Sequence, residues 1–527
     1  MQSIFERGGV TRYTVWEKGG ALVLGAYAVL LSWLSGEVSI LDDDWGHLRL
    51  VGERFPEVLT TSWTGLVGVG GYYRPVVVFS MYLNYLLSGY DPALYHVANV
   101  GIHCGCGVLV FLLAYRLFAH RGVAWAAMAL FVVLPIHTDT VFWIVGRTDS
   151  VCTLFYLGSL VMFLDYLERP SRGQLVGFGV CVCLAFLSKE MALSLPGILV
   201  VLAVYKGALR RVEAKRALVV VGVLLLVYFG LRFVVLGGVF KGVEDRRFSI
   251  FVWGLQTAKA VAKIGMTDYK WFGGVVLLAT GALFIWQRKP GIRDLLFPGG
   301  WMLLCLVPVL GHLHNWYLYL PSVFACIAVA AVWVLPGKRV LYGALACLTV
   351  YYGVVLVREG LFWQEASKIS EHFVEEVLEQ AGDIEGTLYV MNVPSAYMPE
   401  QSFGGKSLMA YALKNALEMR GKRDFRERPV MVNHMWMLDK TFDCALYRRG
   451  PGRYDLNIRR GGFFSFHHEG TSSIYAADGK TVVQTVLEKP WGTVTAAGEG
   501  ALTVQIDLQE PDRVLFYNRG EIQRVDP

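Results

Sequence analysis

The chain has 527 residues, 54% of them hydrophobic, and a mean hydropathy of +0.44. That balance exceeds what a soluble domain carries, and several apolar runs approach the ~20 residues that cross a bilayer, which predicts a polytopic α-helical membrane protein. The net charge of +6 is spread over short gaps between these runs, so it indicates membrane topology rather than nucleic-acid binding.

The N-terminal part begins with a polar leader, residues 1–19, which is consistent with a cytoplasmic start. The first apolar run, Ala21–Ile40, lacks a small-residue cleavage site and predicts a retained helix. Directly after it come three acids, Asp42, Asp43 and Asp44. Each would cost about 2.5–3.5 kcal/mol inside hydrocarbon, so the triplet is expected at the membrane–water boundary, on the outer face. The alternative is that these acids merely end a helix.

The segment after the triplet, residues 42–92, is polar and broken by glycine, which predicts an outer loop. Its apolar run Val76–Leu87 is short for a crossing and predicts a helix lying in the outer interface. The remaining apolar runs predict ten more crossing helices. Nine of them lie at about 93–117, 123–136, 148–167, 174–188, 217–236, 271–286, 295–310, 316–335 and 340–357. The tenth follows the helix 174–188 and runs back across the membrane to Lys206.

Eleven crossings from a cytoplasmic N-terminus divide the chain into a membrane domain, residues 1–358, and an extracytoplasmic domain, residues 359–527. Every second gap is basic, as expected for cytoplasmic loops. The gap 237–270 is predicted to lie outside and yet carries six cations, which suggests an anionic partner. These cations are Lys241, Arg246, Arg247, Lys259, Lys263 and Lys270.

The C-terminal domain is predicted to be a soluble α+β domain. Apolar residues at helical spacing predict a helix over 369–381, and a second helix is expected over 408–419. Alternating or β-branched runs predict strands at 387–393, 429–433, 481–486 and 502–508. The cluster His467-His468-Glu469 lacks a third ligand at zinc spacing and is interpreted as a strand end.

Seven motifs in the membrane part together resemble glycosyltransferases of the GT-C class. The closest likeness is to the protein O-mannosyltransferases, especially those with transmembrane helices and tetratricopeptide repeats, and their bacterial relatives. The resemblance covers the membrane part only, and two features depart from it: Asn315-Trp316 replaces an acidic-basic pair, and no tetratricopeptide repeat follows. The matching stretches are Asp43-Asp44, Tyr73-Arg74-Pro75, Tyr95-His96-Val97-Ala98-Asn99 with His103, Leu134-Pro135-Ile136-His137-Thr138-Asp139, Val145-Gly146-Arg147-Thr148-Asp149, Leu187-Ser188-Lys189-Glu190 and Tyr317-Leu318-Tyr319-Leu320-Pro321-Ser322.

The resemblance implies an inverting enzyme of the hexosyl- or mannosyltransferase type. Such an enzyme takes a sugar from a polyprenyl-phosphate donor and transfers it to a protein, glycan or lipid acceptor at the outer surface of the inner or plasma membrane. Its place in the motif makes Asp43 the general base, with Asp44 positioning it and Asp42 as the alternative. Fixed cations are needed for the leaving phosphate. The candidates are Arg74, Arg147, Lys189, Arg246 and Arg247. The alternative for the first three is that their charged ends merely extend to the membrane interface.

Several polar residues of the membrane part are candidates for lining the substrate cavity. His96, Asn99 and His103 share one helix face, which suits either a helix–helix hydrogen-bond seam or a cavity wall. A divalent cation is conceivable beside an aspartate, although no ligand spacing supports a metal site. The other cavity candidates are His137, Asp139, Asp149, Glu190, His314 and Tyr317.

Two rival functions remain open. The first is a transporter or flippase for a lipid-linked glycan, although transporters place coupling charges in the middle of the bilayer, between repeats. The second is a transferase of the same architecture that acts on a lipid, such as an aminoarabinose-type transferase. The sequence does not separate the second from protein glycosylation.

Overall fold

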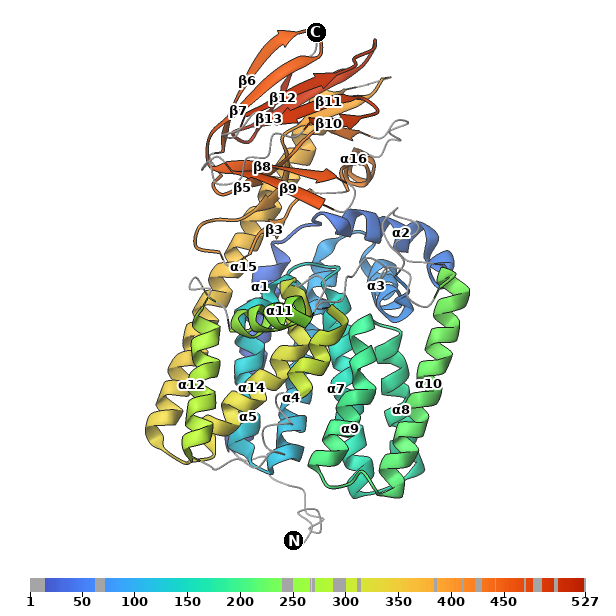
Figure 1. Ribbon diagram of the computed structural model, residues 1–527, viewed down its shortest axis with the longest axis vertical. Helices are drawn as coiled ribbons and strands as arrows, with labels where there is room; N and C mark the ends of the chain where they lie inside the picture. The colour runs from blue at the N-terminus through green and yellow to red at the C-terminus, as the bar shows by residue number, and fades with distance from the viewer. Residues whose placement is uncertain are drawn as a thin grey trace.

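The computed structural model shows a helical bundle with β-sheets stacked on one end of it (Figure 1). The long helices of the bundle lie roughly parallel, and the C-terminal sheets form a separate layer above them. The structure describes residues 15–61, 72–238, 250–265, 267, 271–287, 300–309, 314–382, 386–402, 404–409, 412–421, 429–440, 442–468, 471–476, 486–496 and 501–525.

The bundle is built from apolar helices separated by short turns. Asp91 caps α4 by accepting a hydrogen bond from the Ala93 N–H, and Ser171 caps α8 in the same way. A further helical segment occupies 300–306. The bundle helices are α1 (Val15–Gly36), α4 (Pro92–Phe118), α5 (Arg121–Val133), α7 (Arg147–Glu168), α8 (Arg172–Phe186), α9 (Leu195–Tyr205), α10 (Val212–Leu236), α12 (Phe272–Gln287), α14 (Tyr319–Val334) and α15 (Arg339–Ala381).

Their length and composition support a polytopic membrane protein, as predicted. Among the described residues five helices are long and apolar enough to cross a bilayer, or six if α5 and the following short helices, bent by 53°, form one span. α10 exposes Leu226 and Val234 by 72% and 80%, as a helix facing lipid does. The count of eleven crossings stays a prediction.

Short helices gather at the bundle end that faces the sheets (Figure 1). α3 buries Val77 and Met81 but exposes Leu86 and Leu87, which suits the predicted interfacial helix. Two of these helices, α2 and α11, fall where the sequence predicts loops. The elements are α2 (Asp43–Val58), α3 (Pro75–Ser88), η1 (Pro135–His137), α6 (Thr138–Val141), η2 (Glu190–Ser194), α11 (Ile250–Lys263), η3 (Val307–Val309) and η4 (Asn315–Leu318).

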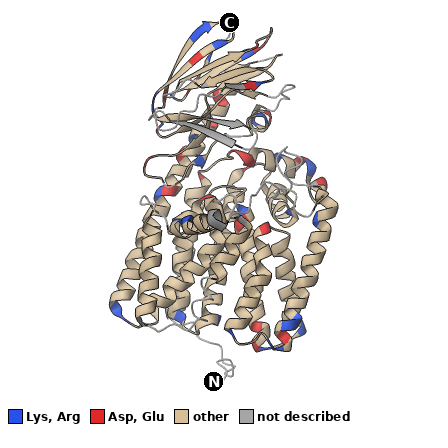
Figure 2. Cartoon of the chain, viewed as in Figure 1, with Lys and Arg blue, Asp and Glu red and all other residues tan. Residues whose placement is uncertain are grey.

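The opposite end of the bundle carries most of its remaining charge. Lys and Arg positions mark the turns there (Figure 2), and Arg116 pairs with Asp165 at 2.5 Å. This is the distribution that the positive-inside rule assigns to a cytoplasmic face. The orientation in the membrane remains a prediction.

α15 joins the bundle to the sheets without a break. Its 43 residues span about 65 Å, and the predicted domain boundary at 358/359 falls inside it. Phe373 and Val377, on the predicted apolar stripe, are buried, and the Phe373 ring meets the Tyr517 ring edge-on at 5.2 Å between centroids. The helix therefore carries the C-terminal domain rigidly.

The C-terminal domain contains three sheets and the helix α16 (Leu413–Gly421). Two sheets combine parallel and antiparallel pairs, and the third is antiparallel throughout. β1, β4, β12 and α16 lie at or beside predicted elements, whereas 481–485 lies outside the described residues. β8 ends at His468.

The strands are ordered as follows. The first sheet is β14 (Glu521–Arg524), β13 (Arg513–Asn518), β1 (Leu388–Met391) and β4 (Val430–Met431). The second is β10 (Val486–Lys489), β11 (Gly492–Ala496), β12 (Ala501–Ile506), β7 (Arg453–Arg460) and β6 (Asp443–Gly450). The third is β3 (Lys406–Ser407), β2 (Val393–Tyr397), β5 (His434–Met437), β8 (Gly462–His468) and β9 (Thr471–Ala476).

Candidate active site at the junction of bundle and sheets

The aspartate triplet begins a helix. Asp42 is the N-terminal boundary residue of α2, and Asp43 and Asp44 lie in its first turn, where the unpaired N–H groups of a helix favour negative charge. The three carboxylates nevertheless have three different surroundings.

Asp44 is used to position the backbone. It is 1% exposed, and its two oxygens accept hydrogen bonds from the N–H groups of Val145, at 2.8 Å, and Leu41, at 3.4 Å. Gly146 follows this contact, and a Cβ there would lie 2.5 Å from the Asp139 carbonyl oxygen, so the turn needs glycine. Asp44 thus ties the start of α2 to the turn between α6 and α7.

Asp42 is held by the C-terminal domain. The Ser407 hydroxyl donates to Asp42 Oδ2 at 2.5 Å, and the Asp42 N–H donates to the Leu408 carbonyl at 2.9 Å. This side chain is 3% exposed. Its carboxylate is therefore engaged by a segment that lies 365 residues further along the chain.

Asp43 is the member of the triplet that is available to accept a proton. It makes no hydrogen bond or ion pair with the residues that the structure describes. Burial, reinforced by the neighbouring Asp42 charge, raises its pKa to about 8. A carboxylate with a pKa near neutrality is suited to accept a proton.

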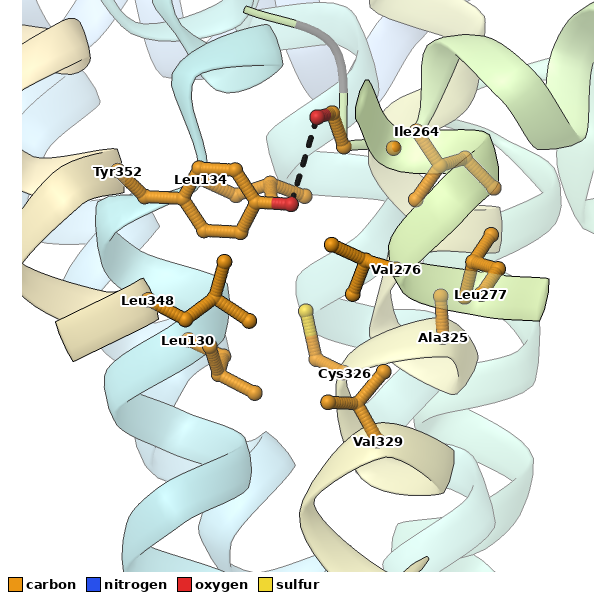
Figure 3. Close-up of a pocket in the computed structure, with 12 residues that line it drawn as sticks. Leu130, Leu134, Ile264, Val276, Leu277, Ala325, Cys326, Val329, Leu348 and Tyr352 are labelled. Carbon is orange, nitrogen blue, oxygen red and sulfur yellow. Dashed lines mark hydrogen bonds between the residues drawn. The ribbon is translucent and has the colours of Figure 1, made fainter. Parts of the chain in front are cut away.

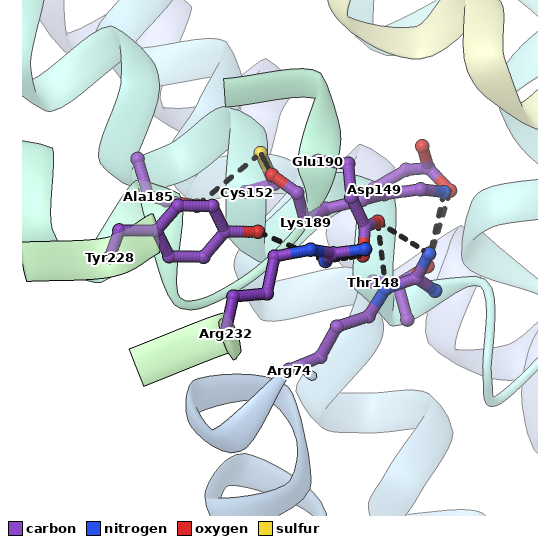
Figure 4. A network of polar contacts seen from close by, with 9 residues as sticks. All are labelled: Arg74, Thr148, Asp149, Cys152, Ala185, Lys189, Glu190, Tyr228 and Arg232. Atoms are coloured by element: carbon purple, nitrogen blue, oxygen red, sulfur yellow. Dashed lines mark hydrogen bonds and ion pairs between the residues drawn. The ribbon is translucent and has the colours of Figure 1, made fainter. Parts of the chain in front are cut away.

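A second feature of the site is a group of five charged residues, here called the Arg74 cluster (Figure 4). Arg74 donates to Glu190 Oε2 at 2.7 Å, and Arg232 approaches Glu190 Oε1 at 3.1 Å. Lys189 Nζ lies 2.5 Å from Asp149 Oδ2. Among the residues that the structure describes, three cations of this cluster face two carboxylates, an arrangement that suits an anionic ligand.

Aromatic rings and α2 flank this cluster. The Arg74 guanidinium lies 4.3 Å from the centre of the Tyr72 ring, and Lys189 Nζ lies 4.7 Å from that of Tyr317. Burial and the Arg74 charge lower the pKa of His47, on α2, to about 3. The charge of Arg74 is therefore felt on the helix that begins with the triplet.

Arg147 does not join the Arg74 cluster, contrary to its assignment as a phosphate ligand. It is fully buried, and its guanidinium donates to Asn99 Oδ1 and Asn84 Oδ1, each at 2.6 Å, and to the carbonyls of Ser80 and Tyr95. With its donors engaged in this way, Arg147 ties α3, α4 and α7 together. Arg246 and Arg247 lie outside the described residues.

The histidine and asparagine stripe of α4 is a helix–helix seam in this structure. Asn99 donates to the carbonyls of the 141–144 turn, and His103 contacts the Tyr319 hydroxyl at 2.7 Å and the Val132 carbonyl at 3.1 Å. His137 contacts the Ser322 hydroxyl at 2.8 Å. These contacts, with full burial of His96, favour the seam over a cavity wall.

A second charged group, here called the Lys406 cluster, was not predicted. Lys406, on β3, is fully buried and lies 2.8 Å from Glu359 Oε2, on α15, and 3.9 Å from Asp139 Oδ1, on α6. Ser402 also donates to Glu359 at 2.9 Å. The C-terminal domain therefore inserts a cation between two carboxylates of the bundle. No local pattern in the sequence signals a contact over so many residues.

The short helix η4 lies between the two clusters. Its first residue, Asn315, accepts a hydrogen bond from Lys263 at 3.5 Å, and its third, Tyr317, faces Lys189. Between them the Trp316 ring stacks on His314 with centroids 4.3 Å apart. The residues that depart from the family motif, Asn315 and Trp316, thus directly precede Tyr317, whose ring contacts Lys189 of the Arg74 cluster.

A separate cavity lies deep in the bundle (Figure 3). It holds about 20 Å³, room for roughly one water molecule, between α5, α12, α14 and α15. Its walls are apolar apart from Cys326 and Tyr352, whose hydroxyl donates to the Gly265 carbonyl at 3.3 Å. It is a packing gap and not a substrate site. Within the described ranges no three His, Cys, Asp or Glu side chains gather as metal ligands do.

Comparison with known proteins finds relatives for a segment of the membrane part. Residues 96–231 match the family model of dolichyl-phosphate-mannose-protein mannosyltransferase. The chain is 38% identical over 127 residues to protein O-mannosyl-transferase Tmtc1 of Drosophila melanogaster, and 36% identical over 139 residues to TMTC3 of Mus musculus. Residues 96–231 of the membrane part are thus O-mannosyltransferase-like. These matches cover 24% and 25% of this chain but only 15% of each relative.

Most of the fold has a structural counterpart. ArnT from Cupriavidus metallidurans, solved with undecaprenyl phosphate bound, aligns with a TM-score of 0.51 over 82% of this chain and 96% of its own. At 14% sequence identity this likeness concerns the fold alone, and it confirms the GT-C architecture. The mannosyltransferase-like region includes Asp149, Lys189 and Glu190, whereas the triplet precedes it.

Proposed function

We propose that this protein is an integral membrane glycosyltransferase that moves a sugar from a polyprenyl-phosphate donor to a hydroxyl group of an extracytoplasmic polypeptide. The observation that carries the proposal is the isolation of Asp43: its two neighbours are engaged, and its pKa is raised to about 8. The Arg74 cluster supplies the cations that a donor phosphate needs, and the similarity to O-mannosyltransferases favours mannose and a protein acceptor.

In this mechanism the acceptor oxygen attacks the anomeric carbon of the donor sugar. The bond between that carbon and the phosphate oxygen breaks, and its electron pair leaves with the lipid phosphate. The hydroxyl proton passes to Asp43, which acts as general base. Attack opposite to the leaving group inverts the anomeric configuration.

The Arg74 cluster would bind the leaving phosphate. Arg74 is half-buried and Lys189 is buried, each beside a carboxylate, so their guanidinium and ammonium groups are fixed before the donor arrives. Burial lowers the pKa of Lys189, and an arriving phosphate would favour its charged form. Preorganised cations of this kind stabilise charge that develops in the transition state.

The test is a transfer assay with purified protein in lipid nanodiscs, polyprenyl-phosphate mannose and a peptide containing Ser or Thr. We expect glycosylated peptide from the natural protein and none from Asp43→Asn. Transfer only to a lipid or glycan would replace the acceptor class. Movement of the lipid-linked sugar across vesicle membranes without any transfer would instead support the flippase alternative.

A further inference from the structure

A cleft of about 590 Å³ opens where the bundle meets the C-terminal domain. One wall is the turn after α1, residues 36–40, together with Trp45 of α2, and a second is the turn between α3 and α4, residues 90–92. Glu371 of α15 and Arg420 of α16 close the third side. Clefts at domain junctions are frequent binding sites, and this volume suits a few residues of an extended chain.

The cleft adjoins the triplet along the chain. Trp45 follows Asp43 by two residues within α2, so their Cα atoms are about 5–6 Å apart by helix geometry. Ile40 precedes Asp43 by three residues, and at 3.8 Å per residue their Cα atoms are at most about 11 Å apart. Two residues along a helix turn by about 200°, so the Asp43 side chain leaves α2 on the side opposite to Trp45. An acceptor in the cleft would therefore bring one side chain to the candidate base around the N-terminal end of α2, past Ile40.

The walls of the cleft carry a surplus of negative charge. Three of its residues, Glu37, Asp91 and Glu371, are carboxylates, and Arg420 is its cation. Arg420 already pairs with Glu371 at 2.6 Å, which leaves two carboxylates to balance. Glu37 and Asp91 are both exposed to solvent. This charge favours an acceptor that is basic.

Trp45 adds a hydrogen-bond donor to the same wall. The residue is 2% exposed, and its indole N–H is buried without a partner in the described part of the chain. Arg420 lies over its ring at 5.5 Å. A buried donor without a partner costs free energy, which a peptide carbonyl bound in the cleft would recover.

Contacts on both sides hold the cleft open in one shape. Arg49 of α2 forms an ion pair with Glu418 of α16, and Ser407 fixes Asp42. The two domains are thus joined on α2 itself. The acceptor would meet a preformed groove, which reduces the entropy cost of binding.

We propose that this cleft binds the acceptor as an extended polypeptide with its Ser or Thr flanked by Lys or Arg. This inference rests on the proposed function and specifies its substrate class. The donor phosphate and the acceptor would then reach Asp43 from separate binding sites, the Arg74 cluster and the interdomain cleft.

The experiment compares two peptides that share one Ser/Thr core, one flanked by Lys and the other by Glu. The variant is Glu37→Gln with Asp91→Asn, which removes both charges while Asn keeps the helix cap at position 91. The matched control is Glu488→Gln, an exposed carboxylate of β10 outside the cleft. Transfer is measured as kcat and KM, and binding separately by fluorescence anisotropy of labelled peptides.

We expect the natural protein and the control to prefer the Lys-flanked peptide. The double variant should raise the KM of that peptide roughly threefold to tenfold, as the loss of two exposed charge pairs does, and leave the KM of the donor unchanged. Trp45→Phe keeps an aromatic ring but removes the N–H, and should weaken binding of both peptides severalfold.

The outcomes separate this inference from the proposed function. Charge-dependent peptide binding without transfer would support the cleft and overturn the transferase. Transfer whose peptide KM is the same in the natural protein and the double variant would overturn the cleft alone. Transfer to a glycan or lipid but not to either peptide would overturn the polypeptide as occupant, and absence of both binding and transfer would overturn both proposals.

Discussion

The most informative test replaces each aspartate of the triplet in turn with asparagine. The three side chains have different surroundings, so the three variants should behave differently. Asp43→Asn keeps the shape but removes the proposed base, so kcat/KM should fall about 10²- to 10⁴-fold. Its melting temperature should stay close to that of the natural protein, since the side chain makes no hydrogen bond or ion pair within the described residues.

Asp42→Asn should shift the pH profile rather than abolish activity. Asparagine still offers an oxygen to the Ser407 hydroxyl, whereas the negative charge that helps to raise the pKa of Asp43 is lost. A charge near a carboxylate shifts its pKa by about one to three units. We take about one unit as the working value, because solvent screens part of the repulsion between the two carboxylates.

The direction of the shift in the pH profile follows from the protonation state in which the base is active. Activity requires ionised Asp43, so the acid limb of the kcat/KM profile should lie near pH 8 in the natural protein and about one unit lower in Asp42→Asn. At pH 7 the ionised fraction would rise from about one tenth to about one half. A weaker base accepts the proton less readily, so kcat/KM should lie between the natural value and about fivefold above it.

Asp44→Asn should damage the fold. Asparagine replaces one of the two acceptor oxygens by an NH₂ group. One of the two backbone N–H groups whose hydrogen bonds Asp44 accepts would then lose its acceptor, which costs about 1–3 kcal/mol. Melting temperature and kcat/KM are measured for all three variants in nanodiscs. A large loss of activity in Asp42→Asn without a shifted acid limb would refute the separation of roles, and normal turnover in Asp43→Asn would refute the base.

Three further predictions concern the surroundings of the triplet. Arg74→Ala should raise the KM of the donor about 10- to 100-fold, as the loss of a charged hydrogen bond does, whereas Arg116→Ala, which breaks an ion pair at the opposite end of the bundle, should not; equal donor kinetics in both variants would reduce Arg74 to an interfacial anchor. Lys406→Met should destabilise the protein by about 3–5 kcal/mol because Asp139 and Glu359 stay buried without their cation, and adding Glu359→Gln should restore part of the lost melting temperature; a double variant no more stable than the single one would contradict this. Reporter fusions at Arg211 and Lys440 should indicate opposite sides of the membrane, and a shared side would reverse the placement of the site.

The sequence was informative wherever a local pattern decides the structure. The apolar runs predicted the long helices because a bilayer selects length and composition, and the stripe containing Phe373 and Val377 predicted the last turns of α15. Local patterns failed at α2: the three acids follow α1 as expected, but they also begin a helix where a loop was predicted. They failed again at α11, because an amphipathic helix rich in lysine resembles a loop in hydropathy alone.

The site residues, too, were predictable only where a local pattern reveals them. The motifs brought Asp43, Arg74, Lys189 and Glu190 into consideration, but a motif does not say where a side chain points. Arg147 has the charge that a phosphate ligand needs, and only its four buried contacts show that it joins three helices instead. Ser407 and Lys406 had no signal at all, because local patterns do not report distant partners: Asp42 precedes Ser407 by 365 residues, and the partners of Lys406, Asp139 and Glu359, lie on other elements.

These long-range contacts bear on whether the bundle and the C-terminal domain are separable. Asp139 and Glu359 belong to the bundle side of the junction, and the ammonium between them comes from β3. A bundle without the C-terminal domain would have to bury two carboxylates beside each other without that charge, or protonate one of them. It would also lose the hydroxyl that holds Asp42. The domain that looks like an accessory in the sequence is therefore joined to the bundle through the residues next to the proposed base, and its removal should disturb chemistry as well as acceptor choice.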